Sequence, residues 1–316
     1  VEISGGTYES PAMTGVTRQK ASTAAREAYF LEFARDLAAT ARMPLMVTGG
    51  IRRRAVVQQA LDGGELLLHY QPQIDLRTGL VMGVEALLRW QHGSAGLIPP
   101  PDIVSAAIRL RLSGQLTEFV GERVCAFLRA LDRKKAHGIR VSINVSPREL
   151  PIHSPAQTLK LVSERYGVDP TRIEIEVTEE AMFDPKRCAD ELKLIDQHGF
   201  GLDIDDFGVG HSSIANLMAV EIDTIKIDRS FIDGIAGNRR DQQLVAAITA
   251  VALPLGHRII AEGVEREADA ECLRMLGCSY GQGWLYGRPM KEDDALAWLV
   301  QHRHAAAAVE PLPHGA

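Results

Sequence analysis

Seven polar residues lie at the ends of seven separate, largely apolar runs of this chain, and four of the seven are carboxylates. Carboxylate and side-chain amide oxygens are the ligands that hard divalent cations prefer in proteins. A cluster that acidic cannot stay unpaired in a partly buried place, so the pattern implies bound cations. The seven residues are Glu85, Asn144, Glu176, Asp205, Lys226, Glu262 and Gln282.

The strongest single motif is the string Asp-Ile-Asp-Asp-Phe-Gly-Val-Gly at 203–210. Its adjacent carboxylates, Asp205 and Asp206, would leave the end of a strand in different directions, so two cations could share them. Two metals about 3.5–4 Å apart can stabilise both the attacking and the leaving oxygen of a phosphoryl transfer. The glycines and the following His211–Ser213 predict a flexible loop over the site, and an ordinary acidic turn is the alternative.

The other motifs are weaker when each is taken alone. Lys226 would keep its charge beside carboxylates and could orient a hydroxide, but a structural salt bridge is equally compatible with it. Glu85, four residues before Arg89, would suit a cation next to a phosphate. Strand alternation puts Glu174 and Glu176 on one side; Glu174 could be solvated at the bottom of a barrel, whereas Glu176 near the top needs a partner. Taken one at a time, Asn144, Glu262 and Gln282 would each be a turn or cap residue more often than a ligand.

The apolar runs that carry these residues have the length and composition of short buried strands. Helical patterns separate most of them, which predicts a (β/α)8 barrel of the TIM type. In such a barrel the carboxyl ends of the strands form one face, where catalytic groups collect. The predicted strands are Leu66–Tyr70, Val81–Val84, Ile139–Ile143, Ile173–Ile175, Gly201–Ile204, Ile222–Ile225, Arg258–Ala261 and Ser279–Gly281.

Residues 1–64 differ from the barrel at 65–302. Strand-like stretches at Val1–Gly6 and Pro44–Gly50 alternate with helical patterns at Ala24–Ala41 and Ile51–Leu61, which predicts a partial β-α-β-α segment. The tail at 303–316 contains an Ala run followed by Pro and Gly and is expected to be disordered.

Composition limits the function classes. The formal net charge of −6 argues against affinity for a nucleic acid polymer. No stretch is apolar for long enough to span a bilayer and no signal pattern opens the chain, so a cytoplasmic location is expected. The cysteines form no CxxC pair, which makes zinc unlikely and favours reduced structural thiols; they are Cys125, Cys188, Cys272 and Cys278.

The barrel region resembles the EAL-domain family of cyclic di-GMP phosphodiesterases. The matching strings are Tyr-Gln-Pro-Gln at 70–73, Glu-Ala-Leu-Leu-Arg-Trp at 85–90, Asn-Val-Ser at 144–146, Glu-Val-Thr-Glu at 176–179, Asp-Asp-Phe-Gly-Val-Gly-His-Ser-Ser at 205–213, Lys-Ile-Asp-Arg-Ser-Phe at 226–231, Ala-Glu-Gly-Val-Glu at 261–265 and Gln-Gly-Trp at 282–284.

The resemblance implies hydrolysis of cyclic di-GMP to linear pGpG at a centre of two Mg²⁺ or Mn²⁺ ions, in a homodimer, with Ca²⁺ inhibiting. It implies that Asp206 serves the second metal, which Asp205 shares, and that Lys226 orients the attacking water. Glu262 and Gln282 would hold a water of the metal centre, and Glu179 would support the loop after Asp206. The first metal would be bound by Glu85, Asn144, Glu176 and Asp205, and the dinucleotide would contact Gln71, Leu87 and Arg89.

The alternative within this family is a catalytically silent cyclic di-GMP receptor. Such receptors usually lose a metal ligand, and none is missing here, which favours the enzyme.

The N-terminal segment resembles the late barrel strands of old yellow enzyme family flavin oxidoreductases. The matching stretches are Val-Glu-Ile-Ser-Gly-Gly-Thr-Tyr-Glu at 1–9, Arg-Glu-Ala-Tyr-Phe-Leu-Glu-Phe-Ala at 26–34 and Pro-Leu-Met-Val-Thr-Gly-Gly at 44–50. In that family, backbone amides of the last stretch help to hold the flavin phosphate. Six strands and the catalytic residues of that barrel have no counterpart here, so we expect a fused remnant that binds no flavin, and a flavin oxidoreductase is the least supported alternative.

Overall fold

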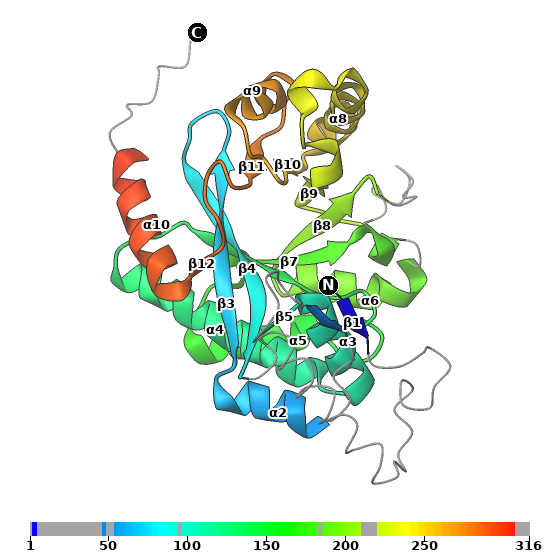
Figure 1. The fold of residues 1–316 in the computed structure, drawn as a ribbon, viewed down its shortest axis with the longest axis vertical. Helices are drawn as coiled ribbons and strands as arrows, with labels where there is room; N and C mark the ends of the chain where they lie inside the picture. The colour runs from blue at the N-terminus through cyan, green and yellow to red at the C-terminus, as the bar shows by residue number, and fades with distance from the viewer. Residues whose placement is uncertain are drawn as a thin grey trace. The chain divides into compact units, whose positions relative to one another are not determined.

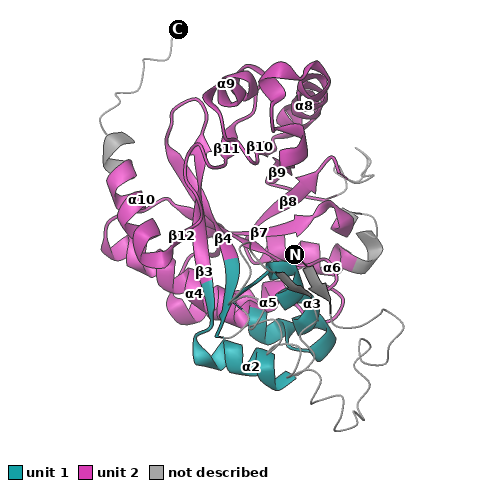
Figure 2. Cartoon of the chain, in the orientation of Figure 1, with its two compact units in different colours: residues 1–67, 88–116 teal, residues 68–87, 117–316 magenta. Residues whose placement is uncertain are grey.

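The computed structural model describes residues 2–4, 46–48, 54–93, 96–182, 185–209 and 220–306. The chain divides into two compact units, residues 1–67 with 88–116 and residues 68–87 with 117–316 (Figure 2). The predicted helix at Ala24–Ala41 and the predicted loop at His211–Ser213 lie outside the described residues, as does the tail from 307 onward.

Eight strands close into a barrel, in the order β3-β11-β10-β9-β8-β7-β6-β4, with β4 pairing back onto β3. Figure 1 shows β7 to β11 following one another around it. The seven strands from β4 to β11 in this order all run parallel to one another. The predicted barrel is confirmed; its strands are β3 (Leu66–Asp75), β4 (Val81–His92), β6 (Arg140–Asn144), β7 (Ile173–Thr178), β8 (Gly201–Phe207), β9 (Thr224–Ile227), β10 (Arg258–Ala261) and β11 (Tyr280–Gln282).

One strand departs from the predicted strand–helix repeat, because β3 runs antiparallel to β11. The physical reason is its short connection to β4, which leaves no room for a helical crossover. The Asp75 carboxylate accepts hydrogen bonds from the backbone amides of Arg77 and Thr78, both at 2.8 Å. Gly79 completes the turn at a φ of 72°, a conformation that costs glycine little. A hairpin therefore begins the barrel.

Four of the eight strands, β3, β4, β7 and β8, are longer than predicted, and three others have the predicted length but are shifted by one or two residues. Only Arg258–Ala261 has the predicted bounds, whereas β4 and β8 run on through the polar residues that were expected to follow them. The reason is strand alternation, which turns every second side chain into the barrel, where many positions are polar. An apolar run in the sequence therefore ends before the strand does.

Helices cover the second unit, and apolar side chains on the outer side of the strands pack beneath them. Tyr70 of β3 stacks on Phe127 of α4, with ring centroids 3.9 Å apart and planes 7° from parallel. Burial of an aromatic or aliphatic side chain of this size contributes roughly 1.5–3 kcal/mol. The helices are α4 (Ser113–Arg133), α5 (Pro155–Tyr166), α6 (Pro185–Gln197), α8 (Arg239–Ala252), α9 (Glu267–Met275) and α10 (Glu292–Ala306).

Local sequence signals fix several helix ends. Ser154 caps α5 by accepting a hydrogen bond from the amide of Gln157, and Asn238 caps α8 in the same way. Helix α10 runs to Ala306, so the first four residues of the tail expected at 303–316 are helical. The short elements of this unit are η1 (Pro170–Arg172), η2 (Glu179–Met182), η3 (Arg229–Phe231), η4 (Ile235–Gly237), η5 (Leu253–Leu255) and β12 (Met290–Lys291).

The first unit contains a two-stranded parallel sheet of β1 (Glu2–Ser4) and β2 (Met46–Thr48), which fall inside the two predicted N-terminal strands. It also holds α2 (Arg54–Gly63), β5 (Gly96–Ile98) and α3 (Pro100–Leu110). Helix α2 covers the described part of the helix predicted at Ile51–Leu61.

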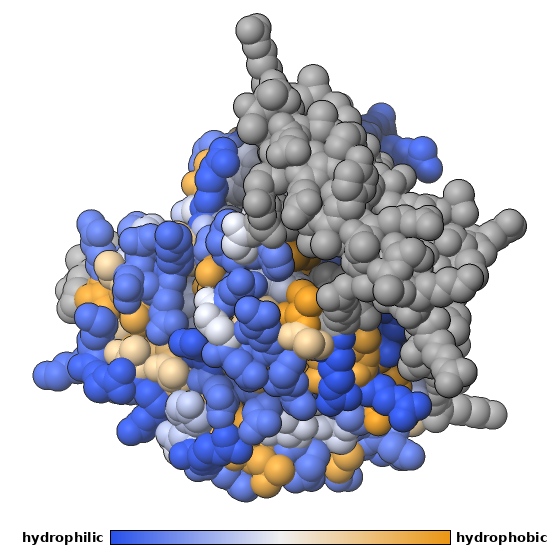
Figure 3. All heavy atoms as spheres, turned by 60° about the horizontal axis from the view of Figure 1, so that its bottom comes forward, coloured by the Kyte–Doolittle hydropathy of each residue, from blue (hydrophilic) through white to orange (hydrophobic). Residues whose placement is uncertain are grey.

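The described residues on the face drawn in Figure 3 are mostly hydrophilic, with small apolar patches between them. Such scattered apolar groups are ordinary on a protein surface. Among the helices that the structure describes, none has the length and apolar character needed to cross a membrane.

Candidate active site

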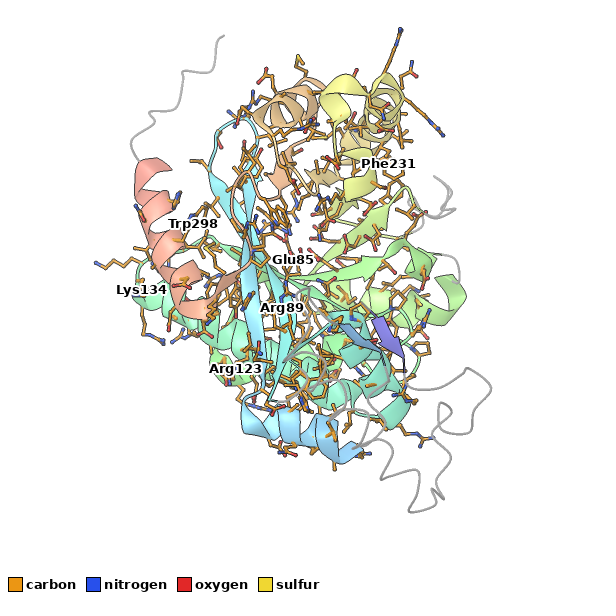
Figure 4. All side chains as sticks on the ribbon, viewed as in Figure 1. Glu85, Arg89, Arg123, Lys134, Phe231 and Trp298 are labelled. Atoms are coloured by element: carbon orange, nitrogen blue, oxygen red, sulfur yellow. The ribbon has the colours of Figure 1, made fainter. Side chains whose placement is uncertain are left out.

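Register and alternation bring side chains of neighbouring strands together inside the barrel. Asn144 of β6 lies beside Glu176 of β7, and Thr178 of β7 lies beside Asp205 of β8. Because residues paired across parallel strands face the same side, these groups enter the barrel near the carboxyl ends of its strands. Glu85 extends from β4 toward the same cluster (Figure 4).

Lys226 of β9 is the centre of the cluster. Its Nζ lies 2.7 Å from Glu262 Oε1, 2.9 Å from Glu176 Oε2, 3.3 Å from Asp205 Oδ1 and 3.6 Å from Glu85 Oε2. The side chain is completely buried. Burial opposes its charge, but the surrounding carboxylates, first Asp205 and Glu176, raise the pKa of Lys226 well above its ordinary value. The ammonium group therefore stays charged.

Glu85 accepts hydrogen bonds from two side-chain amides. Asn144 Nδ2 donates to its Oε1 at 2.6 Å, and Gln282 Nε2 donates to its Oε2 at 2.5 Å. Although burial opposes ionisation, Lys226 and these amides lower the pKa of Glu85. Glu85 is thus ionised.

Three other carboxyl groups of the site hold protons more tightly than usual. Burial and the neighbouring charge of Glu85 raise the pKa of Glu176 well above its ordinary value. Burial raises the pKa of Glu262 to about 8, with Lys226 opposing and Asp205 adding to the rise. Burial and Asp205 also raise the pKa of Asp206. The site therefore carries more negative groups than one lysine can balance, so it attracts further positive charge.

The donor set fits a hard divalent cation. One oxygen each of Asp205, Asp206 and Glu262 lies within 4.8 Å of the others. Asp206 adopts a φ of 54°, an uncommon conformation for a residue with a side chain. Within this cluster, Glu176 Oε1 is buried and has no hydrogen-bond partner among the described residues.

The four predicted ligands of the first metal are not gathered as closely as Asp205, Asp206 and Glu262 are. Within the described part of the chain, Glu85 and Glu176 join no carboxylate group as tight as the one at Asp206. They converge with Asp205 on the ammonium group of Lys226 instead. The predicted ligands thus share one cluster, in which the lysine lies between them.

Glu179 follows β7 and reaches the end of β8. The backbone amide of Gly208 donates to Glu179 Oε2 at 3.2 Å. Gly208 has a φ of 103°, and an added Cβ there would meet the ring of Phe231 at 3.0 Å. The segment that leaves Asp206 is therefore held by a carboxylate and by close packing against the residue labelled Phe231 in Figure 4.

The three predicted substrate residues lie on β3 and β4. Gln71 is buried; its Nε2 donates to the Gly287 carbonyl at 3.1 Å, and its Oε1 accepts from Gln282 Nε2 at 3.3 Å. Leu87 is half-buried at the edge of the second unit. Arg89 belongs to the first unit, where its Nη1 donates to the Leu88 carbonyl at 2.8 Å.

A second polar layer lies one pleat deeper in the barrel, and sequence reasoning missed most of it. Glu174, which from the sequence could have been a solvated residue, is buried and paired, because Arg140 and Arg258 donate to its Oε1 at 3.1 and 2.5 Å. Burial and Glu174 raise the pKa of the completely buried Asp203 to about 8. The available signal was alternation, since Asp203 precedes Asp205 by two residues and so shares its face.

Fold and site together define an α/β barrel with an acidic cluster around one buried lysine at the carboxyl ends of its strands. A family model, the EAL domain, matches residues 54–289 of the chain. The chain therefore belongs to the EAL domain family, and the corresponding resemblance of its sequence is confirmed.

Two relatives come from Pseudomonas aeruginosa. The chain is 37% identical over 243 residues to the bifunctional diguanylate cyclase/cyclic di-GMP phosphodiesterase MucR. This match covers 76% of this chain and 35% of that protein. It is 35% identical over 276 residues to the cyclic di-GMP phosphodiesterase NbdA. That match covers 87% of this chain and 34% of that protein. The chain thus spans about a third of the length of these curated relatives.

A solved structure, the PaMucR phosphodiesterase in complex with c-di-GMP, has a TM-score of 0.70 and 36% sequence identity to this chain. The match covers 76% of this chain and 98% of that chain. The similarity therefore extends over nearly the whole length of that solved chain.

Proposed function

We propose that this chain hydrolyses cyclic di-GMP to linear pGpG and so lowers the level of a bacterial second messenger. In this reaction a water oxygen forms a bond to one phosphorus, and the bond from that phosphorus to a 3′ oxygen breaks. The similar proteins MucR and NbdA carry phosphodiesterase names, and the similar solved structure is a c-di-GMP complex.

One observation supports the proposal most strongly, the convergence of three carboxylates beside a fully buried lysine. Asp205, Asp206 and Glu262 offer oxygens within 4.8 Å of one another, and Lys226 Nζ lies 2.7 Å from Glu262. Mg²⁺ or Mn²⁺ held there would supply Lewis-acid activation of a phosphate oxygen and of water. We assign the metal-holding role to Glu85, Asn144, Glu176, Asp205 and Asp206.

The remaining roles belong to the chain's own polar groups. Lys226 Nζ orients the attacking water and stabilises negative charge that develops beside it, because its own charge is secured by four carboxylates. Glu262 and Gln282 position that water. Glu179 holds the segment at Gly208. The substrate is bound by Gln71, Leu87 and Arg89.

The test is incubation of the purified chain with cyclic di-GMP and Mg²⁺, followed by chromatography for pGpG. A parallel sample with a chelator and a sample of Asp205→Asn serve as controls. We expect pGpG only in the metal-loaded wild type.

The same experiment separates the enzyme from a silent receptor. Binding of cyclic di-GMP without any pGpG, at Mg²⁺ and Mn²⁺ concentrations that saturate the site, would make the chain a receptor. Absence of both binding and turnover would reject the proposal as a whole.

The finer features belong to the same proposal. Ca²⁺ should bind and inhibit, because it takes more ligands at longer bonds than Mg²⁺ does and so loosens a two-metal geometry. We propose a homodimer, which light scattering of the purified protein tests, and a cytoplasmic location.

We also propose the domain boundaries 1–64, 65–302 and 303–316, with residues 1–64 a remnant of a flavin-enzyme barrel that binds no flavin. The described parts of that segment before Arg54 are the short strands β1 and β2, which cannot close a barrel. An absorption spectrum of the purified chain tests this, since bound flavin absorbs visible light.

A further inference from the structure

Gln73 lies inside the barrel, directly opposite Gln282 in the antiparallel pair of β3 and β11. Both side chains are buried, at 3% and 4% exposure. Gln73 Nε2 donates to Gln282 Oε1 at 3.1 Å. Gln73, which was assigned no role from the sequence, thus makes a direct contact with a residue of the candidate site.

That contact completes the hydrogen bonds of Gln282. The NH₂ group of Gln282 donates to Glu85 Oε2 at 2.5 Å and to Gln71 Oε1 at 3.3 Å. A side-chain amide can turn over without a change of shape, so only its partners decide which end faces which group. The turned amide would place an oxygen against the Glu85 carboxylate, which is repulsive.

Gln73 is itself fixed from two sides. An added Cβ on Gly83 would lie 3.0 Å from Gln73 Oε1, so the bare glycine makes room for this side chain. On the other side Gln73 Nε2 lies 3.5 Å from Ser142 Oγ, which in turn donates to Glu174 Oε2 at 3.5 Å. Glu174 is paired with two arginines, so the row of hydrogen bonds begins at a rigid group.

We propose that Gln73 is a positioning residue that fixes the amide of Gln282 with its NH₂ group toward Glu85. The kinetic side of this proposal rests on the proposed hydrolysis, in which Glu85 and Gln282 take part. In this role Gln73 acts through Gln282.

The first experiment is a double-mutant cycle on turnover. Gln73→Leu keeps the size of the side chain and removes the donor. We expect kcat to fall about 5- to 100-fold, the rate equivalent of one lost buried hydrogen bond, with KM within about threefold. In a Gln282→Ala background, Gln73→Leu should have no further effect on kcat, because the group it positions is gone.

The second experiment is the same cycle on urea unfolding of the metal-free protein, which requires neither metal nor substrate. The destabilisation by Gln73→Leu should be smaller in the Gln282→Ala background than in the wild type. Thr249→Val is the matched control: this buried hydroxyl donates to the Leu276 carbonyl at 2.9 Å, on another element, so its loss should lower stability without changing kcat.

Additive effects in both cycles would overturn the proposal, since Gln73 would then be structural only. Should Gln73→Leu fail to fold, Gln73→Met removes the same donor with an unbranched side chain of similar length; an unchanged kcat in folded Gln73→Met would count against the proposal. A wild type that does not hydrolyse cyclic di-GMP would reject the proposed function, while the unfolding cycle would still decide whether Gln73 and Gln282 are coupled.

Discussion

Lys226 Nζ and Glu262 Oε1 lie 2.7 Å apart at the carboxyl ends of two neighbouring strands, and the lysine side chain is completely buried. Three further carboxylates lie within 3.6 Å of the same ammonium group. In the absence of a metal, this one ammonium group therefore faces four carboxyl groups.

Lys226→Met should strongly destabilise the metal-free protein. It leaves buried carboxylates without their partner, and breaking a buried ion pair in this way typically costs about 3–5 kcal/mol. Urea unfolding in the presence of a chelator measures the loss. The same unfolding free energy in variant and wild type would show that the carboxylates are compensated by something other than Lys226.

Asp205→Ala and Glu85→Ala should each abolish hydrolysis in a folded protein. Each removes an anionic group from the proposed metal site, and loss of one such stabilising group commonly slows a reaction at least about a hundredfold. Turnover is measured as pGpG formation, with circular dichroism as the control for folding. Near-wild-type rates in either variant at millimolar Mg²⁺ would contradict the site assignment.

The metal-free protein should lose stability as the pH rises from about 5 to about 8. The pKa of Glu262 is about 8 in the folded chain, above its ordinary 4.5, and that of Asp203 is also about 8. Between these values the folded protein holds protons that the unfolded chain has released, so raising the pH favours unfolding.

Thermal unfolding across this pH range, with a chelator present, checks the direction. Glu262→Gln should flatten the pH dependence, since the amide does not titrate. A stability that rises between pH 5 and 8 would mean that these carboxyl groups are ionised in the metal-free fold.

Arg89→Ala should weaken cyclic di-GMP binding more than it slows turnover at saturating substrate. A guanidinium bonded to phosphate acts in both ground and transition states, and the loss of such a charged hydrogen bond corresponds to about 10- to 100-fold in Kd. Calorimetry with Ca²⁺ in place of Mg²⁺ measures the affinity without turnover. An unchanged Kd would give Arg89 a structural role only.

A chain that starts at Arg52 should fold and hydrolyse cyclic di-GMP at a rate comparable to that of residues 1–316. It keeps α2 and every strand of the barrel. Equal rates at matched Mg²⁺ concentration are expected. A shortened chain that is folded but inactive would make residues 1–51 part of the working enzyme.

The barrel and its polar residues were predictable because each site residue follows an apolar run, and parallel strands carry their ends to one face. The reversed direction of β3 was not, since the turn at Asp75 and Gly79 has no signal that separates a hairpin from an ordinary loop in a longer crossover. The deeper polar layer of Glu174 and Asp203 was not predicted, for another reason. Glu174 is identical in type to a solvated glutamate, and only the arrival of Arg140 and Arg258 from strands distant in sequence makes it buried and paired.

The position of β3 also dictates when the site can exist during synthesis. Gln73 and Gln282 are 209 residues apart in the chain, yet they are direct partners where the barrel closes. At roughly 5–20 residues per second, a ribosome needs about 10–40 s to travel that distance. For that time the first hairpin has an open edge, which is the exposed pairing surface that promotes misassociation. The last strand of the closed barrel to be made, β11, both pairs with this edge and brings in the amide that faces Glu85, so closure of the barrel and completion of the site are one event.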